Sequence, residues 1–162
     1  MWEQVRVLPA DTCEHLAAAQ ELLADYLALR PSGRGHVSPL PGFLQDEVDT
    51  LPGGYAPPHG CLLIATVEEQ PAGVVASAWA GDGIVEMKRL YVYPLFRRHG
   101  VGRMLSSAMI DWARATGYER ARLDVWPTRA EAIALYRTLG FREVTPFHTY
   151  PFPMVFMELD LG

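Results

Sequence analysis

The spacing of apolar residues divides the chain into segments with the period of an α-helix and segments with the period of a β-strand. The strongest helical pattern repeats every three or four residues and is followed by Gly117, a residue suited to cap a helix C-terminus. Its apolar face consists of Val101, Met104, Leu105, Ala108, Met109 and Trp112. This pattern predicts a long amphipathic helix that packs one face on a core.

Two more helices are predicted in the first third of the chain. Asp11 and Glu14 resemble a capping box at the start of the first helix, and Pro31 is expected to end it. The second helix is expected over residues 43–51. It lies between two loops, residues 31–42 and 52–60, which are rich in proline and glycine.

Short apolar runs separated by turn residues predict strands before and after the long helix. Thr128 and Glu131 form a second capping box, which predicts a last helix that ends at Gly140. Because strands come first and then alternate with helices, we expect an α/β (α+β) domain with a mixed, mostly antiparallel sheet of about seven strands and about four helices. The expected strands span residues 4–8, 61–67, 72–79, 84–92, 121–126, 141–144 and 154–161.

Length and charge narrow the class of protein. The 162 residues are expected to form one domain over residues 1–162. The net charge of −5 argues against nucleic-acid binding, which needs a basic face. No stretch approaches the ~20 apolar residues of a membrane helix, and residues 1–9 lack the pattern of a signal peptide. We therefore expect a cytoplasmic protein without membrane association.

Cysteine and histidine positions give no indication of a metal site. Cys13 and Cys61 form no CxxC pair and are expected to be reduced and inert. The histidines form no HxxH motif and no His/Cys cluster, so no metal ligands are predicted. They are His15, His36, His59, His99 and His148.

Residues 86–103 carry the candidate chemistry. A predicted strand leads into a loop with Gly100 and Gly102, and the loop opens onto the long helix. The free N–H groups and the dipole of a helix N-terminus bind anions, and Arg97, Arg98 and Arg103 would add positive charge. The loop lacks the Gly-Lys-Ser/Thr of a P-loop and the third glycine of a dinucleotide fingerprint. On the glycines alone, a tight turn with solvated arginines is an equal alternative.

The surrounding residues resemble a known family. Arg97-x-x-Gly100-x-Gly102 is similar to the pyrophosphate-binding motif of the GNAT superfamily of N-acetyltransferases. The preceding Leu90-Tyr91-Val92-Tyr93-Pro94 resembles the family's fourth strand and the turn after it. A later block, Ala132-x-x-Leu135-Tyr136-x-x-Leu139-Gly140-Phe141, resembles its later helix and the next strand. The resemblance implies a GNAT-like fold and an acyltransferase that takes an acetyl group from acetyl-CoA.

The resemblance also implies roles for single residues. Backbone groups of Leu90, Tyr91 and Val92 would pair with the pantetheine arm, and an N–H near Leu90 would face the thioester oxygen. The pyrophosphate would lie on the loop of Arg97, Arg98, His99, Gly100, Val101, Gly102 and Arg103. Where many members carry an asparagine that contacts the cofactor, this chain has Arg129, either a phosphate ligand or an exposed residue.

Two residues match catalytic positions of the family. Tyr136 matches the tyrosine that often protonates the leaving thiolate; a purely packing role is the alternative. Glu86 matches the general base of some members, which takes a proton from the amine through water; the alternative is a strand residue that points to solvent or pairs with Lys88.

The implied reaction is direct transfer to an amine of a small molecule or peptide in a ternary complex. Neither cysteine lies in the motifs, so no acyl-enzyme is expected. A non-catalytic acyl-CoA-binding or sensing domain is the alternative, and a homodimer stays possible. The acceptor pocket would be formed by residues 31–42 and 145–153.

Overall fold

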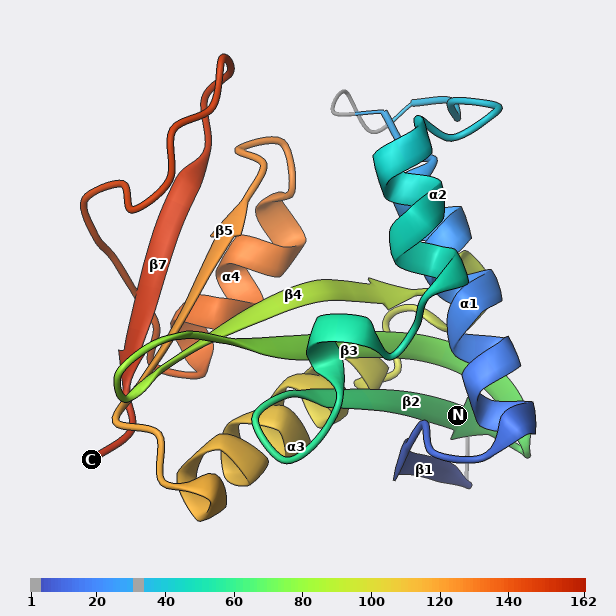
Figure 1. The fold of residues 1–162 in the computed structure, drawn as a ribbon, viewed down its shortest axis with the longest axis horizontal. Helices are drawn as coiled ribbons and strands as arrows, with labels where there is room; N and C mark the ends of the chain where they lie inside the picture. Colours follow the sequence, from blue (N-terminus) through green and yellow to red (C-terminus); the bar gives the residue numbers. More distant parts are fainter. Residues whose placement is uncertain (1–3, 31–33) are drawn as a thin grey trace.

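The computed structural model describes residues 4–30 and 34–162 of the chain. In these residues, seven strands form one sheet with the order β1-β2-β3-β4-β5-β7-β6 (Figure 1). Neighbouring strands are antiparallel except β4 and β5, which are parallel. The predicted mixed, mostly antiparallel sheet is thus confirmed. The strands are β1 (Val5–Pro9), β2 (Cys61–Val67), β3 (Gln70–Gly81), β4 (Ile84–Val92), β5 (Arg120–Val125), β6 (Arg142–Glu143) and β7 (Val155–Asp160).

Helices cover both faces of the sheet. In the first core, buried Leu22 and Leu23 of α1 pack with Ile64 of β2. In the second, Leu105 and Met109 of α3 pack with the side chains of β4 and β5 that point to the opposite face. Figure 1 shows α1 and α2 together on one side and α3 on the other. The helices are α1 (Cys13–Leu27), α2 (Gly42–Asp49), α3 (Val101–Thr116) and α4 (Ala130–Thr138), with short 3-10 turns η1 (Gly53–Tyr55) and η2 (Pro94–Phe96).

Both predicted capping boxes are wrong. The N-cap of α1 is Thr12, whose Oγ1 accepts a hydrogen bond from the His15 N–H at 3.1 Å, so the helix starts one residue later than Asp11 implied. The N-cap of α4 is Arg129, which makes no side-chain capping bond. The Glu131 carboxylate, expected in that box, instead lies 3.5 Å from the Arg98 guanidinium.

The first helix also ends earlier than expected. It stops at Leu27, and Leu29 forms an isolated bridge with His36. Pro31, which was expected to end the helix, lies outside the described residues. None of the helices in the described ranges has the length and apolar character that crossing a bilayer requires.

The sheet splits between β4 and β5, and the split positions the candidate site. Among the described residues, the parallel pairing covers three residue pairs, from Ile84↔Arg120 to Glu86↔Arg122. Beyond Glu86, β4 stays paired with β3 while β5 follows β7, and in Figure 1 β5 and β7 rise steeply away from β4. A bulge at Arg89, whose φ is 64°, shifts the β3–β4 register and adds to the divergence.

Candidate active site

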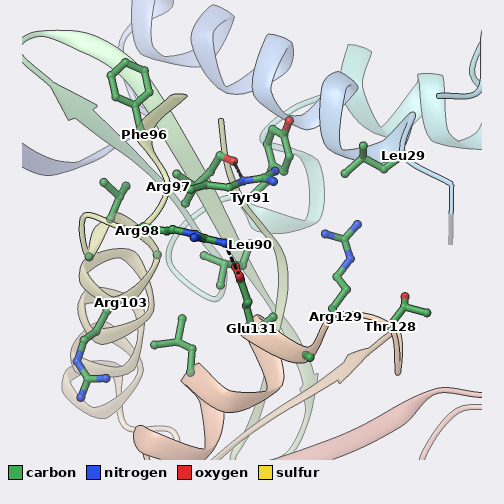
Figure 2. A pocket seen from close by; sticks show the side chains of 17 residues that line it. Leu29, Leu90, Tyr91, Phe96, Arg97, Arg98, Arg103, Thr128, Arg129 and Glu131 are labelled. Carbon is green, nitrogen blue, oxygen red and sulfur yellow. Dashed lines mark hydrogen bonds and ion pairs between the residues drawn. The ribbon is translucent and has the colours of Figure 1, made fainter. Parts of the chain in front are cut away.

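A cavity of about 640 Å³ lies beside the split in the sheet (Figure 2). Its wall combines the end of β4, the loop before α3 and the first turns of α3 and α4, and we call it the α3 cavity. The described residues that line it are Leu29, Leu90, Tyr91, Val92, Phe96, Arg97, Arg98, Gly100, Val101, Gly102, Arg103, Thr128, Arg129, Ala130, Glu131, Ala132 and Leu135. All the cofactor-binding residues expected from the sequence are among them except His99.

The N-terminus of α3 presents backbone donors to this cavity. Gly100 is the N-cap and has a φ of 80°, a left-handed conformation that glycine adopts without strain. The first hydrogen bond of the helix runs from the Met104 N–H to the Gly100 carbonyl at 3.0 Å. The N–H groups of Val101, Gly102 and Arg103 precede that bond and have no partner within the helix. Such donors can bind an anion, and the helix dipole adds positive potential at the same place.

The arginines of the loop have separate positions. Arg97 donates from Nε to the Val92 carbonyl at 2.8 Å, and its guanidinium lies 5.5 Å from the centre of the Tyr91 ring. Figure 2 shows Arg98 directed across the cavity to Glu131, whereas Arg103 points away and donates to the Thr138 hydroxyl at 2.9 Å. Arg98 is therefore the loop arginine whose side chain spans the opening of the cavity.

Arg129 faces the cavity from the opposite wall. Its guanidinium lies 5.0 Å from the centre of the Tyr26 ring and 5.1 Å from that of Trp126. Such stacking holds the cation in place without neutralising its charge. Arg129 and the donors of α3 therefore present positive charge from two sides of the same cavity.

The end of β4 offers a free backbone edge. The Tyr93 N–H donates to the carbonyl of Ala72, a residue of β3, at 2.8 Å. Because backbone groups alternate in direction along a strand, those of Leu90 and Val92 face away from β3 and toward the split. The bond from Arg97 to the Val92 carbonyl agrees with that direction. An extended ligand in the split can thus pair with β4 as an added strand would.

Tyr136 lies deeper than the cavity wall. Its side chain is buried, and its ring packs against Phe141 with 5.7 Å between centroids. Burial raises the pKa of the Tyr136 hydroxyl well above its ordinary value, the nearby Tyr26 raises it further, and the positive charge of Arg129 lowers it. The hydroxyl therefore stays protonated at neutral pH, which a general acid requires. Tyr136 is not one of the described residues that line the cavity.

Glu86 lies at the closed end of the split, in the last residue pair that joins β4 to β5. Its neighbours Val85 and Met87 pack in the core beneath α3, so the Glu86 side chain points to the face that carries α1 and α2. Glu86 Oε1 accepts from Arg122 Nε at 3.0 Å and lies 2.9 Å from His148 Nε2. The contact with Lys88, which the sequence left open as an alternative to a catalytic role, is present, but at 3.8 Å it is the longest of these contacts.

Asp124 and Tyr150 lie beside Glu86, Arg122 and His148. Tyr150 donates from its hydroxyl to Asp124 Oδ2 at 2.7 Å. Ligand-type atoms of Glu86, Asp124 and His148 all lie within 4.8 Å of one another. We call Glu86, Arg122, Asp124, His148 and Tyr150 the Glu86 cluster. Arg122 donates to the same Glu86 oxygen that faces His148, so a metal ion at this place would have to displace a guanidinium.

Sequence reasoning missed most of the Glu86 cluster. It found Glu86 through the family motif, but it treated His148 as a scattered histidine. The 62 residues between Glu86 and His148 explain this, because no spacing rule connects two residues that meet only in the folded sheet. The only available signal was the richness in aromatic residues of the segment after β6.

Comparison with known proteins agrees with the fold. The model of the acetyltransferase (GNAT) family matches residues 19–141. An uncharacterised N-acetyltransferase of Schizosaccharomyces pombe is 36% identical over 122 residues, which cover 74% of this chain and 75% of that protein. The matches to several further curated relatives span 32 to 56% of the length of those proteins.

Solved structures share the fold at lower sequence identity. A PaiA N-acetyltransferase of Thermoplasma acidophilum, in complex with coenzyme A, has a TM-score of 0.78 and 15% identity over 98% of this chain and 99% of that one. A Salmonella typhimurium acetyltransferase, with acetyl-CoA, has a TM-score of 0.70 and 21% identity over 99% and 95%. The family match covers most of the chain, which confirms the predicted fold and enzyme class: this chain belongs to the acetyltransferase (GNAT) family.

Proposed function

We propose that this chain transfers an acetyl group from acetyl-CoA to an amine by direct attack in a ternary complex. The observation that carries the proposal is the row of N–H donors on α3, at Val101, Gly102 and Arg103, beside the open edge of β4. A pyrophosphate and an extended amide-containing arm need these two features next to each other. Both line one cavity of about 640 Å³, a volume suited to hold part of such a ligand.

The residues that line the α3 cavity bind acetyl-CoA and orient it. The donors at the N-terminus of α3 hold the pyrophosphate, Arg98 and Arg129 approach its charge from opposite walls, and Leu90 and Val92 pair with the pantetheine arm. The backbone N–H near Leu90, next to the bulge at Arg89, lies on the free edge of β4, where it donates to the thioester oxygen as negative charge develops there.

Two side chains move protons in this proposal. Tyr136, which burial keeps protonated, gives its proton to the leaving thiolate. On the other side of the thioester, Glu86 takes part in removing a proton from the incoming amine, which must be neutral to attack. The neutral amine nitrogen forms the C–N bond, and the C–S bond breaks.

A thiol-release assay with acetyl-CoA and a set of amines tests the proposal. L-lysine, spermidine, tyramine, alanyl-alanine and aniline cover aliphatic, peptide N-terminal and aromatic amines. We expect thiol release that depends on one of these amines and saturates with acetyl-CoA. The competing function, a non-catalytic acyl-CoA sensor, predicts acetyl-CoA binding by calorimetry without amine-dependent release from any of the set.

A further inference from the structure

The segment between β6 and β7 brings a histidine to the closed end of the split. His148 lies in this segment, and its Nε2 is 2.9 Å from Glu86 Oε1. The segment is anchored by Phe147, whose ring lies 4.2 Å from the Arg122 guanidinium and packs edge-on against Phe156 of β7. The imidazole is therefore held over β4 and β5 rather than left in a loose loop.

The Glu86 carboxylate has little capacity left to accept a proton from a substrate. Its Oε1 already takes part in two short contacts, with Arg122 Nε and with His148. Lys88 Nζ approaches Oε2 at 3.8 Å, and the Glu86 side chain is 8% exposed. Hydrogen bonds from cationic donors favour the charged form of a carboxylate and occupy its lone pairs.

His148 has the access that Glu86 lacks. Its side chain is 37% exposed. When a carboxylate accepts from Nε2–H, the carboxylate fixes the tautomer, and the neutral ring keeps its lone pair on Nδ1. A carboxylate oxygen of Asp124 lies within 4.8 Å of the nearest ligand-type atoms of Glu86 and His148. The Asp124 carboxylate accepts a hydrogen bond from the Tyr150 hydroxyl, which holds it in place. An ammonium group that approaches His148 thus meets the Asp124 carboxylate, whereas the charge of Glu86 is already shared with Arg122 and Lys88.

From this geometry we infer that His148 is the catalytic base, that Glu86 is the residue that positions it, and that the acceptor is an aliphatic amine that arrives as an ammonium ion. This inference rests on the proposed acetyl transfer. It assigns a role to a residue outside the motifs of residues 86–103 and 132–141, and it turns the expected base, Glu86, into the partner that fixes the tautomer of the imidazole.

The protons balance in this scheme. His148 Nδ1 takes one proton from R–NH3+, directly or through one water, and passes it from its exposed ring to solvent. The lone pair of R–NH2 then forms the C–N bond with the thioester carbon. As the C–S bond breaks, Tyr136 protonates the thiolate, and a second N–H proton of the amine restores the Tyr136 hydroxyl. The products are the amide, coenzyme A as a thiol, and one proton.

The test measures kcat/KM for three variants: His148→Gln, Glu86→Gln and the double variant. Each variant is assayed with an aliphatic and with an aromatic amine as the acceptor. Tyramine and aniline serve as the acceptors; tyramine is an ammonium ion at neutral pH and aniline is not. His59→Gln is the matched control, because the His59 side chain is exposed and only its carbonyl is used, by the Tyr118 hydroxyl at 2.6 Å. Calorimetry with acetyl-CoA and thermal unfolding show that each variant is folded.

We expect His148→Gln to lower kcat/KM for tyramine at pH 7 by about 100-fold, with a much smaller loss for aniline. The double variant should lose no more than the worse single variant, because Glu86 acts through His148. The pH profile of kcat/KM for His148→Gln should follow only the deprotonation of tyramine. The groups that face the imidazole are Glu86, Arg122, Asp124 and Tyr150, and none of these is altered in His148→Gln.

Four results would overturn the inference. Equal losses for tyramine and aniline would mean that His148 only supports structure. A large loss in Glu86→Gln with normal turnover in His148→Gln would return the base to Glu86. Absence of turnover with every amine of the set, in a wild-type protein that binds acetyl-CoA, would remove the catalytic proposal and this inference together. Turnover of aniline and of no aliphatic amine of the set would contradict the inference alone.

Discussion

The α3 cavity and the Glu86 cluster are assembled in opposite ways. The cavity takes its anion-binding donors from consecutive residues, 100–103, and their chemistry is that of the backbone at a helix N-terminus. The cluster joins side chains from β4, β5 and the segment before β7. A backbone site tolerates many side chains and appears as a short motif, whereas a side-chain site depends on the whole sheet and can vary with the acceptor.

The largest expected effect is on acetyl-CoA affinity, after a change among the backbone donors of α3. Gly102→Glu places a carboxylate among the α3 donors, and we expect acetyl-CoA affinity to fall about 1000-fold, since like charges in contact cost several kcal/mol. Gly102→Ala is the matched control: its Cβ would lie 3.7 Å from both Leu135 and Val92, an ordinary contact, so affinity should change little. Calorimetry measures both. Equal affinities for the two variants would mean that the pyrophosphate lies elsewhere.

Removal of the Tyr136 hydroxyl should affect the chemical step and not binding. We expect Tyr136→Phe to lower kcat about 100-fold, the lower end of general acid catalysis. Its acetyl-CoA affinity should stay at the wild-type value, because the buried ring keeps its packing against Phe141. Pre-steady-state kinetics measures the rate of the chemical step, and calorimetry measures acetyl-CoA affinity. A change in kcat of less than about twofold would leave Tyr136 with a packing role only.

The ion pair between β4 and α2 should contribute to stability and to its pH dependence. Arg89 donates to Glu47 from Nε at 2.8 Å and Nη2 at 2.7 Å, and Tyr55 donates to Glu47 at 3.0 Å. Burial alone would raise the pKa of Glu47, but the bonds and charge of Arg89 and the Tyr55 bond bring it below its usual value of 4.5. Glu47→Gln should therefore lower the free energy of unfolding at pH 7 by about 2 kcal/mol.

The sign of the pH effect follows from the lowered pKa. Because folding makes the Glu47 carboxylate harder to protonate, its stabilisation is complete above the unfolded pKa and is lost as pH falls below 4.5 through the folded value. Wild type should lose stability over that range more steeply than Glu47→Gln in urea unfolding. Tyr55→Phe, which keeps the Arg89 pair, should resemble wild type; parallel curves for wild type and Glu47→Gln would refute the assignment.

The smallest effect is expected at the mouth of the cavity. Arg98 and Glu131 are both largely exposed and 3.5 Å apart, so their pair is weak. Glu131→Gln frees Arg98 for a phosphate, and acetyl-CoA affinity should rise about two- to threefold at low salt. Asp111→Asn, which breaks the comparable Arg114 pair at the far end of α3, is the control and should leave affinity unchanged. A loss of affinity in Glu131→Gln would show that Glu131 contacts the ligand.

The difference between the two sites also explains what the sequence could predict. The bounds of β2 and β4 were predicted to the residue, because turn residues rich in glycine and proline mark their ends. The donors of α3 were found because Gly100 and Gly102 mark them locally. The predicted start of α1 was wrong because the residue next to Asp11, Thr12, can also cap a helix and does so here. His148 was missed since only tertiary pairing brings it to Glu86.

The central claim is that acetyl-CoA bound beside α3 gives up its acetyl group to an amine presented from the Glu86 cluster. Mass spectrometry of the amine after incubation with wild-type protein and isotopically labelled acetyl-CoA tests it most directly. The account predicts one labelled acetyl group on an aliphatic amine, with the product strongly reduced for Gly102→Glu and for His148→Gln. Bound acetyl-CoA with no labelled amine from the wild-type protein would contradict it.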